Sequence, residues 1–284
     1  MSEYSQSFGT QWQRYRRTQL DSFTGTTYSR DRLERCLGAS INSLRGKRVL
    51  EVGSGAGRFT EWLTQSGAIL TAMDASAAVY ANAANCRRLG PYVLMQADVN
   101  RAPLRPKSFD AVLCLGVIQH TPSPERTIAD LAALVAGGGA LVLDHYAAWS
   151  FGHRIRDLAT LGTPLRAILR RVARHRPELA MRATRALTAI CDPVRRRTSH
   201  FPALDRIAGR LFPTACYYTS YPNLSPALIY EWNELDTHDQ LTDWFKHRRS
   251  TAEIRQALET AGLVVERCTY AGNGVEARAH RRTE

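Results

Sequence analysis

The sequence lacks closely spaced cysteines and long hydrophobic runs. Its six cysteines are scattered and none form a Cys-x-x-Cys pair, so neither a disulfide framework nor a thiolate zinc site is predicted. No stretch approaches the roughly 18 apolar residues of a membrane span. Residues 1–10 are polar and lack the basic and apolar regions of an export signal. We therefore expect a soluble, cytoplasmic protein with reduced cysteines.

Internal repeats and low-complexity tracts are also lacking. Of the 284 residues, 44% are hydrophobic and 23% are charged, which is near the average for globular proteins. This composition excludes intrinsic disorder for most of the chain. The length predicts one large domain, or one domain with an insertion.

Short apolar runs alternate with helical patterns from residue 48 onward, which predicts a parallel sheet covered by helices. The expected strands are 48–52, 69–73, 92–96, 111–115, 140–144, 263–266 and 274–279, the last as a hairpin partner. The expected helices are 58–65, 76–89 with Ser76 as N-cap, one that Ser123 and Pro124 open and glycines 137–139 end, and one from a Ser250–Glu253 capping box to residue 261.

Residues 147–247 differ in charge from the rest of the chain. Up to Arg210 this stretch holds fourteen arginines and four acidic residues, so ten of the net +12 charges lie here. Apolar residues recur at three- and four-residue spacing over 158–172, which predicts an amphipathic helix with an arginine-rich outer face. Three interpretations stay open: a solvated face, contact with an anionic acceptor or carrier, and attachment to a membrane surface or RNA.

A glycine-rich turn follows the first expected strand, in Val49-Leu50-Glu51-Val52-Gly53-Ser54-Gly55-Ala56-Gly57-Arg58. Glycines at alternate positions let the backbone approach a ligand closely, which predicts a nucleotide-like cofactor. Arg58 stands where the dinucleotide fingerprint requires its third glycine, so NAD is disfavoured. A Gly-Lys-Ser or Gly-Lys-Thr ending is missing, so ATP is disfavoured too.

Three carboxylates end or follow successive strands of the expected sheet. Asp74 can accept hydrogen bonds from ribose hydroxyls, Asp98 from the exocyclic amine of adenine, and Glu51 lies beside the same crevice. Three acids without a phosphate cradle suit a cationic nucleoside. Each acid alone could equally be a helix N-cap or a solvated loop carboxylate.

These motifs resemble those of the class I S-adenosylmethionine-dependent methyltransferases. Glu51-x-Gly53-x-Gly55-x-Gly57 is similar to the first motif of that family, and Asp74 to its ribose-binding acid. Ala97-Asp98 is similar to its adenine-contacting pair, and Phe109–Val112 to its fourth strand. The resemblance implies that S-adenosylmethionine contacts Glu51, Gly53, Ser54, Gly55, Gly57, Asp74, Ala75, Ala97, Asp98, Val99, Leu115 and Gly116.

The family fold implied is α/β: a Rossmann-like, doubly wound, mostly parallel seven-stranded sheet with an N-terminal helical lid and a helical insertion after strand five. The expected division is a lid segment over 1–46, a cofactor-binding core over 47–146, an Arg-rich insertion or substrate lid over 147–247, and a terminal helix and strands over 248–284.

Methyl transfer is an in-line displacement that depends mostly on holding the acceptor near the methyl group. If the acceptor loses a proton, His120 is the nearest base, with His145 and Tyr146 as further catalytic candidates. His120 could instead only hydrogen-bond the backbone of its own turn.

The acceptor pocket is expected to draw on the N-terminal segment, the insertion and the loop after strand four. Its candidate residues are Trp12, Tyr15, Gln119, Tyr218, Tyr221 and Trp232. Acids and histidines from Asp236 to His247 fit zinc or manganese in type but not in spacing, so no metal site is predicted.

The loop Leu115–Pro122 is similar to that of small-molecule members of the family. The function expected is therefore methylation of a small molecule, with oxygen as the acceptor atom, in bacterial secondary or glycan metabolism; an anionic acceptor is one of the expectations. The alternatives are an RNA methyltransferase that uses the basic surface, although no RNA-recognition fold is evident, and a non-catalytic S-adenosylmethionine-binding protein.

Overall fold

The computed structural model describes residues 5–148, 162–272 and 274–283. The chain divides into two compact units. Described residues 27–148 and 245–283 form the first, here called the sheet unit, and residues 5–26 and 162–244 form the second, here called the helical unit.

A seven-stranded sheet is the centre of the sheet unit, and its strands run in the order β3-β2-β1-β4-β5-β7-β6. Strand β7 runs antiparallel to both of its neighbours, and the other pairings are parallel. The strands are β1 (Arg48–Val52), β2 (Ile69–Asp74), β3 (Val93–Gln96), β4 (Phe109–Cys114), β5 (Val135–His145), β6 (Val264–Ala271) and β7 (Gly274–His280). The expected Rossmann-like, mostly parallel sheet is therefore confirmed.

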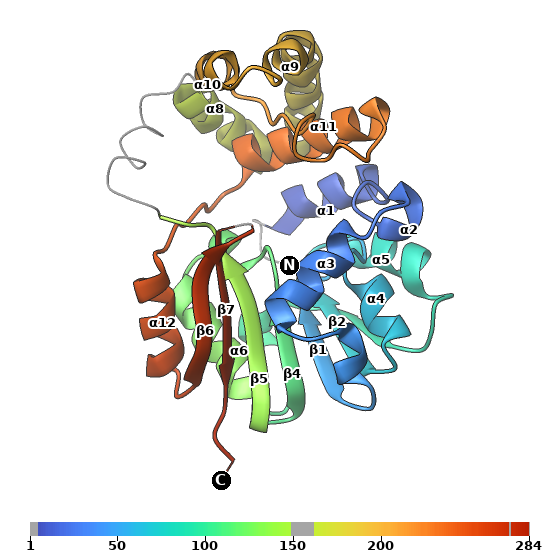
Figure 1. Cartoon of the computed structure of the whole chain (residues 1–284), viewed down its shortest axis with the longest axis vertical. Coiled ribbons are helices and arrows are strands. Elements are labelled where there is room, and N and C mark those ends of the chain that lie inside the picture. The colour runs from blue at the N-terminus through green and yellow to red at the C-terminus, as the bar shows by residue number, and fades with distance from the viewer. Residues whose placement is uncertain (1–4, 149–161, 273, 284) are drawn as a thin grey trace. The chain divides into compact units, whose positions relative to one another are not determined.

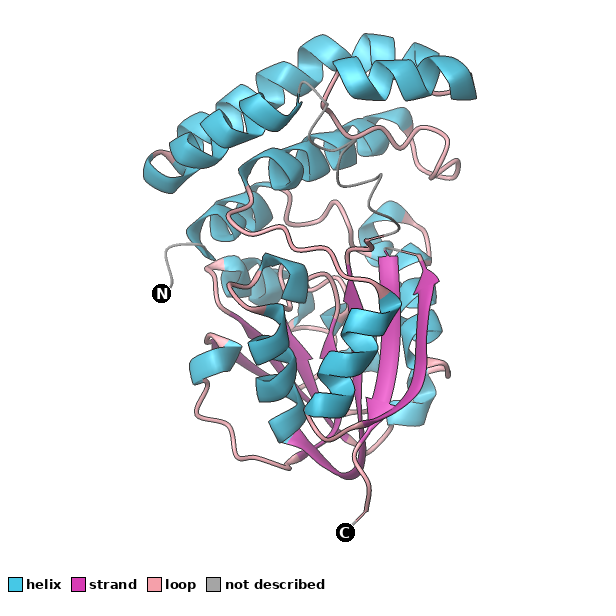
Figure 2. Ribbon diagram, turned by 90° about the vertical axis from the view of Figure 1, so that its left-hand side faces the viewer, coloured by secondary structure: helices cyan, strands magenta, loops and turns pink. Residues whose placement is uncertain are grey.

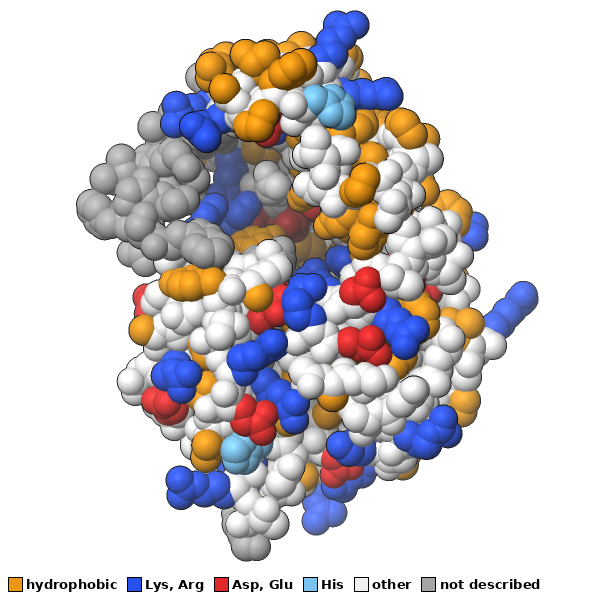
Figure 3. Space-filling view, viewed as in Figure 1, with side chains coloured by type: hydrophobic (Ala, Val, Ile, Leu, Met, Phe, Trp, Pro, Cys, Tyr) orange, Lys and Arg blue, Asp and Glu red, His pale blue; other side chains and the backbone are white. Residues whose placement is uncertain are grey.

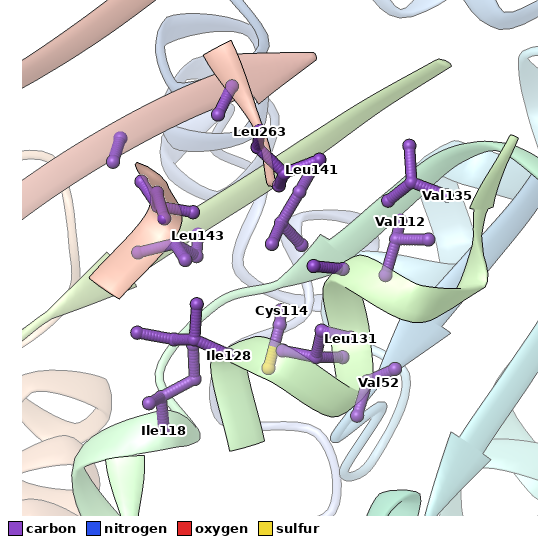
Figure 4. Close-up of a cluster of buried hydrophobic side chains, with 14 of the residues drawn as sticks. Val52, Val112, Cys114, Ile118, Ile128, Leu131, Val135, Leu141, Leu143 and Leu263 are labelled. Atoms are coloured by element: carbon purple, nitrogen blue, oxygen red, sulfur yellow. The ribbon is translucent and has the colours of Figure 1, made fainter. Parts of the chain in front are cut away.

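Alternate residues of the strands face two separate hydrophobic clusters, because successive side chains of a strand point to opposite faces. One cluster joins Leu50, Val112 and Leu141 to helices α6 (Pro124–Leu134) and α12 (Thr251–Thr260). Figure 4 shows Ile128 and Leu131 of α6 among the sheet side chains of this cluster.

The other cluster covers the opposite face of the sheet. It joins Val49, Leu113 and Val142 to three elements. These are α3 (Tyr28–Leu37), the 3-10 turn η1 (Ile41–Leu44) and α4 (Thr60–Gln65). Helix α5 (Ala78–Cys86) packs on α4, β2 and β3, and 3-10 turns η2 (Val99–Arg101) and η3 (Ile118–His120) follow β3 and β4. Helices thus flank the sheet on both sides (Figures 1 and 2).

Several turn signals act as the sequence predicts. Ser123 caps α6 by accepting from the Arg126 N–H, and Pro124 occupies the first helical turn. Ser250 and Glu253 form a complete capping box at α12. Ser76 lies just before the helix it was expected to cap: its Oγ accepts from the Ala78 N–H, while the N-cap position is Ala77.

The expectation that glycines 137–139 end a helix is wrong. Helix α6 ends at Leu134 and β5 begins at Val135, so the glycines lie inside the strand. A side chain on Gly139 would come within 2.9 Å of the Asp110 carbonyl oxygen of β4. Gly139 therefore permits close strand pairing, at the point where the β4–β5 register shifts.

The helical unit contains α1 (Ser5–Arg14), α2 (Asp21–Thr24), α8 (Gly162–His175), α9 (Pro177–Thr198), α10 (Pro202–Leu211) and α11 (Pro226–Thr242). Helices α8, α9 and α11 pack on one another, and α1 packs on α9 and α11. Helix α8 covers the end of the amphipathic segment expected at 158–172, whose first four residues lie outside the described residues. Within the described ranges, every helix is too short or too polar to cross a membrane.

Candidate functional site

The glycine turn after β1 has the backbone conformation that its residues predict. Gly53, Gly55 and Gly57 all have positive φ, of 76°, 50° and 101°. A side chain at Gly57 would come within 2.5 Å of the Cys86 sulfur of α5, and one at Gly53 would collide with Val117. Two of the glycines are thus required by neighbours inside the protein, as well as by any ligand that approaches the turn.

The side chain of Glu51 is part of a buried hydrogen-bond network next to this turn. Its side chain is 3% exposed, and its Oε2 accepts a 2.6 Å hydrogen bond from the Thr60 hydroxyl. Asn82 donates to the same hydroxyl oxygen. Burial raises the pKa of Glu51 to about 8, an effect that the nearby Asp74 charge increases and the bond from Thr60 opposes.

Two buried oxygens at the turn lack a hydrogen-bond partner among the described residues, Oε1 of Glu51 and Oγ of Ser54. An unpartnered buried acceptor is costly unless a ligand supplies a donor. The site therefore fits a ligand that carries a cationic donor, such as an ammonium group.

Asp74 ties the ends of β1 and β2 together. The Gly55 N–H donates to its Oδ2 at 2.9 Å, and the N–H and hydroxyl of Ser76 donate to its Oδ1 at 2.8 and 2.6 Å. A carboxylate has about four acceptor sites, so three bonds leave room for a ligand hydroxyl. Burial raises the pKa of Asp74, and these hydrogen bonds oppose the rise.

Asp98 follows β3 and begins the turn η2. Its carboxylate accepts from the Asn100 N–H at 3.1 Å, so it caps this turn, as the alternative interpretation of a lone acid expected. The preceding residue, Ala97, donates its N–H to the Asp74 carbonyl oxygen at 2.9 Å. Ala75 directly follows Asp74 in the chain, and Val99 directly follows Asp98.

Four neighbouring strands thus bring the predicted cofactor residues to one edge of the sheet, since the carboxyl ends of parallel strands meet there. The register pairs Val52 with Met73, and Asp74 with Gln96. Leu115 and Gly116 follow β4 at the same edge. A crevice at the carboxyl ends of the strands is the usual ligand position in such sheets.

Asp144 and Arg32, which hold the turn after β4, were not predicted from the sequence. Asp144 is fully buried, accepts from the Gly116 N–H at 2.6 Å, and forms an ion pair with Arg32 of α3. Asp144 shares with Glu51 and Asp74 its place at the carboxyl end of a strand. That placement was the available signal, whereas nothing in the sequence joins Arg32 to it.

His120 lies in η3 and is 7% exposed. Its Nδ1 lies 3.2 Å from the Phe245 carbonyl oxygen, and its ring meets that of Tyr146 edge to face. A carbonyl can only accept, so Nδ1 carries the proton in this bond, and in the neutral ring the lone pair is on Nε2.

His145, by contrast, is fully buried. Its Nδ1 contacts the Tyr146 carbonyl oxygen at 3.0 Å, and burial lowers its pKa to about 4. The ring is therefore neutral at pH 7 and withdrawn from solvent. A catalytic role for His120, His145 or Tyr146 stays a prediction.

The segment after α11 returns to this edge, which the sequence did not indicate. His247 donates its backbone N–H to the Gln119 carbonyl at 2.9 Å, and Arg249 donates to that of Tyr146 at 3.0 Å. The predicted substrate residue Gln119 is 1% exposed, and its Oε1 has no partner among the described residues.

The other predicted substrate residues belong to the helical unit. Tyr15 and Trp12 pack with Met181 and Leu235, and Tyr15 donates to Glu234 at 3.3 Å. Tyr221 stacks on Trp232 with ring centroids 4.6 Å apart, and Tyr218 donates to Asp192 at 2.9 Å. Their contact with an acceptor stays a prediction.

Three of the acids and histidines weighed as metal ligands have other partners. Asp236 accepts from Tyr217, His238 contacts Thr184, and Asp243 pairs with Arg166. The described part of the chain holds no group of three or more residues able to bind a metal ion.

Comparison with known proteins gives a match of residues 50–143 to the methyltransferase domain family. A ubiquinone biosynthesis O-methyltransferase from Coxiella burnetii is 36% identical over 102 residues, which cover 35% of this chain and 43% of that protein. Its counterpart from Azoarcus sp. (strain BH72) is 34% identical over 106 residues, or 34% and 43% of the two chains. The chain thus spans less than half the length of the curated relatives it matches.

Among solved structures, an O-methyltransferase family protein from Burkholderia thailandensis superposes with a TM-score of 0.52. It is 12% identical, and the match covers 93% of this chain and 59% of that one. At this identity the likeness shows the fold alone. The matched region spans β1 to β5 and contains the glycine turn and the acids after β2 and β3. Residues 50–143 therefore match a methyltransferase domain, and this part of the chain is similar to class I S-adenosylmethionine-dependent methyltransferases.

Proposed function

We propose that the chain transfers a methyl group from S-adenosylmethionine to an oxygen atom of a small molecule. The observation that carries this proposal is the edge formed by the glycine turn, Glu51 and Asp74, where a buried carboxylate oxygen lacks a hydrogen-bond partner within the described part of the chain. The O-methyltransferase names of the partial relatives support oxygen as the acceptor atom.

The ligand-holding roles follow from the acceptors at this edge. Oε1 of Glu51 would accept from the ammonium group, and the remaining acceptor site of Asp74 would accept from ribose hydroxyls. Asp98 would accept from the adenine amine. When bound, S-adenosylmethionine supplies an electrophilic methyl carbon on a sulfonium.

Proton removal from the acceptor is assigned in this proposal to Nε2 of His120. The bond from Nδ1 to the Phe245 carbonyl supports it, because this bond fixes the tautomer that leaves a lone pair on Nε2. Tyr146, in edge contact with the same ring, would orient His120 or the acceptor.

An anionic acceptor is part of the same proposal. The Lys246 ammonium lies 5.6 Å from the centre of the Tyr146 ring, so a positive charge stands beside the expected acceptor position. Phenolates and carboxylates of biosynthetic intermediates, including those of secondary or glycan metabolism, have the required charge.

The test is release of S-adenosylhomocysteine when the full chain is incubated with S-adenosylmethionine and a panel of phenols, hydroxy acids and glycosides. The proposal predicts release with at least one such compound, and loss of release in a Glu51→Ala variant. Release of S-adenosylhomocysteine only when RNA is the acceptor would favour the nucleic-acid alternative. Tight binding of S-adenosylmethionine without release of S-adenosylhomocysteine with any acceptor would favour a non-catalytic role.

A further inference from the structure

Exposed apolar side chains concentrate in one part of the helical unit. Of the fourteen large hydrophobic residues that are exposed among the described residues, seven lie between positions 179 and 211. They are Leu179, Ile190, Val194, Phe201, Leu204, Ile207 and Leu211. We call this set the α9–α10 apolar surface. In Figure 3, hydrophobic side chains gather over these two helices.

Helix α10 presents a single apolar stripe. Leu204, Ile207 and Leu211 recur at three and four residues, so they share one side of the helix, and each is at least half exposed. The helix is held to α9 by other groups, since Ala208 is buried and Asp205 forms an ion pair with Arg195 at 3.0 Å. The apolar stripe is thus not the packing face of α10.

Helix α9 repeats the arrangement. Leu179, Ile190 and Val194 are separated by eleven and four residues, which is close to three turns and one turn of a helix. The buried residues of α9, such as Thr184, Thr188 and Cys191, lie at different positions of the turn. Both helices therefore bury one side and leave a second apolar side exposed.

Positive charge accompanies this surface. Residues 177–211 contain seven arginines and three acids. Five of these arginines are exposed, namely Arg182, Arg196, Arg197, Arg206 and Arg210. Two of the acids are engaged inside the unit, Asp192 by Tyr218 and Asp205 by Arg195. Exposed apolar stripes bordered by arginines are the pattern of helices that lie in a membrane interface.

We propose that the α9–α10 apolar surface binds the surface of an anionic lipid bilayer. Leucine and isoleucine side chains would enter the acyl boundary, and the bordering guanidinium groups would hydrogen-bond lipid phosphates. The charge of the segment matches that of an anionic leaflet, and α9 and α10 would lie along the bilayer plane without crossing it. The inference is independent of the proposed methyl transfer.

Vesicle flotation of the full chain tests the proposal. Vesicles of phosphatidylcholine alone and of phosphatidylcholine with phosphatidylglycerol are compared at low and high salt. The expected result is co-flotation with the anionic vesicles, reduced at high salt. The double variant Leu204→Ser/Ile207→Ser and the charge reversal Arg206→Glu/Arg210→Glu should each lower the partition coefficient by roughly tenfold or more.

Matched controls come from the sheet unit. Ile69→Ser/Val93→Ser removes two side chains that are more exposed than the α10 pair, and Arg87→Glu/Arg88→Glu reverses two exposed charges. Both controls should float like the unaltered chain. Equal loss in the controls, or binding that ignores the α10 apolar variant, would overturn the proposal.

Light scattering without lipid measures whether a second copy of the chain covers the α9–α10 apolar surface instead of a bilayer. If a second copy covers the surface, the free chain is a dimer, Leu204→Ser/Ile207→Ser makes it monomeric, and vesicles do not bind. That combination would also overturn the proposal, whereas a monomer that binds anionic vesicles supports it.

Discussion

Substituting Gly57 by alanine tests the physical account of the glycine turn. The φ of +101° costs a side chain about 1–2 kcal/mol. The added Cβ would lie 2.5 Å from the Cys86 sulfur, and overpacking of this kind costs about 1–3 kcal/mol. We therefore expect Gly57→Ala to lower the free energy of unfolding of the sheet unit by about 2–5 kcal/mol.

Two further variants separate these contributions. Gly46 has a φ of +71° and open space around its expected Cβ, so Gly46→Ala should cost about 1–2 kcal/mol, from backbone strain alone. Cys86→Ala removes the colliding sulfur, so the double variant with Gly57→Ala should be more stable than the sum of the single changes predicts, by about 1–3 kcal/mol.

Native-state hydrogen exchange of the β1 and β4 amides is the suitable assay, because it reports the stability of the sheet unit separately from the helical unit. Strictly additive effects of Gly57→Ala and Cys86→Ala would refute the reasoning. A loss at Gly46 as large as that at Gly57 would refute it too.

Three further predictions concern charged and titrating groups. Because the pKa of Glu51 is raised to about 8 in the folded chain, the unfolded chain loses this proton first as pH rises. The free energy of unfolding should therefore fall between about pH 4.5 and pH 8. Glu51→Gln should remove this fall in urea denaturation, and parallel plots of stability against pH for the two proteins would contradict it. Asp144→Asn should lower the free energy of unfolding by about 3–5 kcal/mol, because it leaves the buried guanidinium of Arg32 unpaired. Asp110→Asn, in an exposed ion pair, should lower it by under about 1 kcal/mol, and equal losses in thermal denaturation would argue against the buried pair. His120→Ala should lower turnover by about 10²–10⁴-fold without changing the affinity for S-adenosylhomocysteine. The control His280→Ala, at a half-exposed histidine, should leave both quantities unchanged. Unaltered turnover in His120→Ala would contradict the role of His120 as base.

The sequence predicts the sheet unit well because its signals are local. Alternating apolar runs, the Ser123 and Ser250 caps and the glycine turn each depend on a few adjacent residues. Glycines 137–139 were wrongly predicted to end a helix, because a glycine run also permits close strand pairing. Only the β4 backbone beside Gly139 distinguishes a helix end from a strand here.

The candidate site divides in the same way. The placement of Glu51, Asp74 and Asp98 could be predicted, since each lies at or just after the end of a strand that hydrophobicity reveals. The contacts of Arg32 with Asp144 and of Phe245 with His120 join residues more than 100 positions apart. No periodicity records such pairings, so these contacts required the structure.

Calorimetric titration of the ligand-stripped full chain with S-adenosylhomocysteine tests whether this edge of the sheet binds the cofactor. We expect binding of one molecule per chain. Asp74→Asn should weaken this binding by roughly 10–100-fold, because hydrogen bonds to a charged carboxylate contribute about 1.5–3 kcal/mol. Absence of binding by the unaltered chain, or equal affinity in the Asp74→Asn variant, would contradict the assignment of this edge of the sheet as the cofactor site.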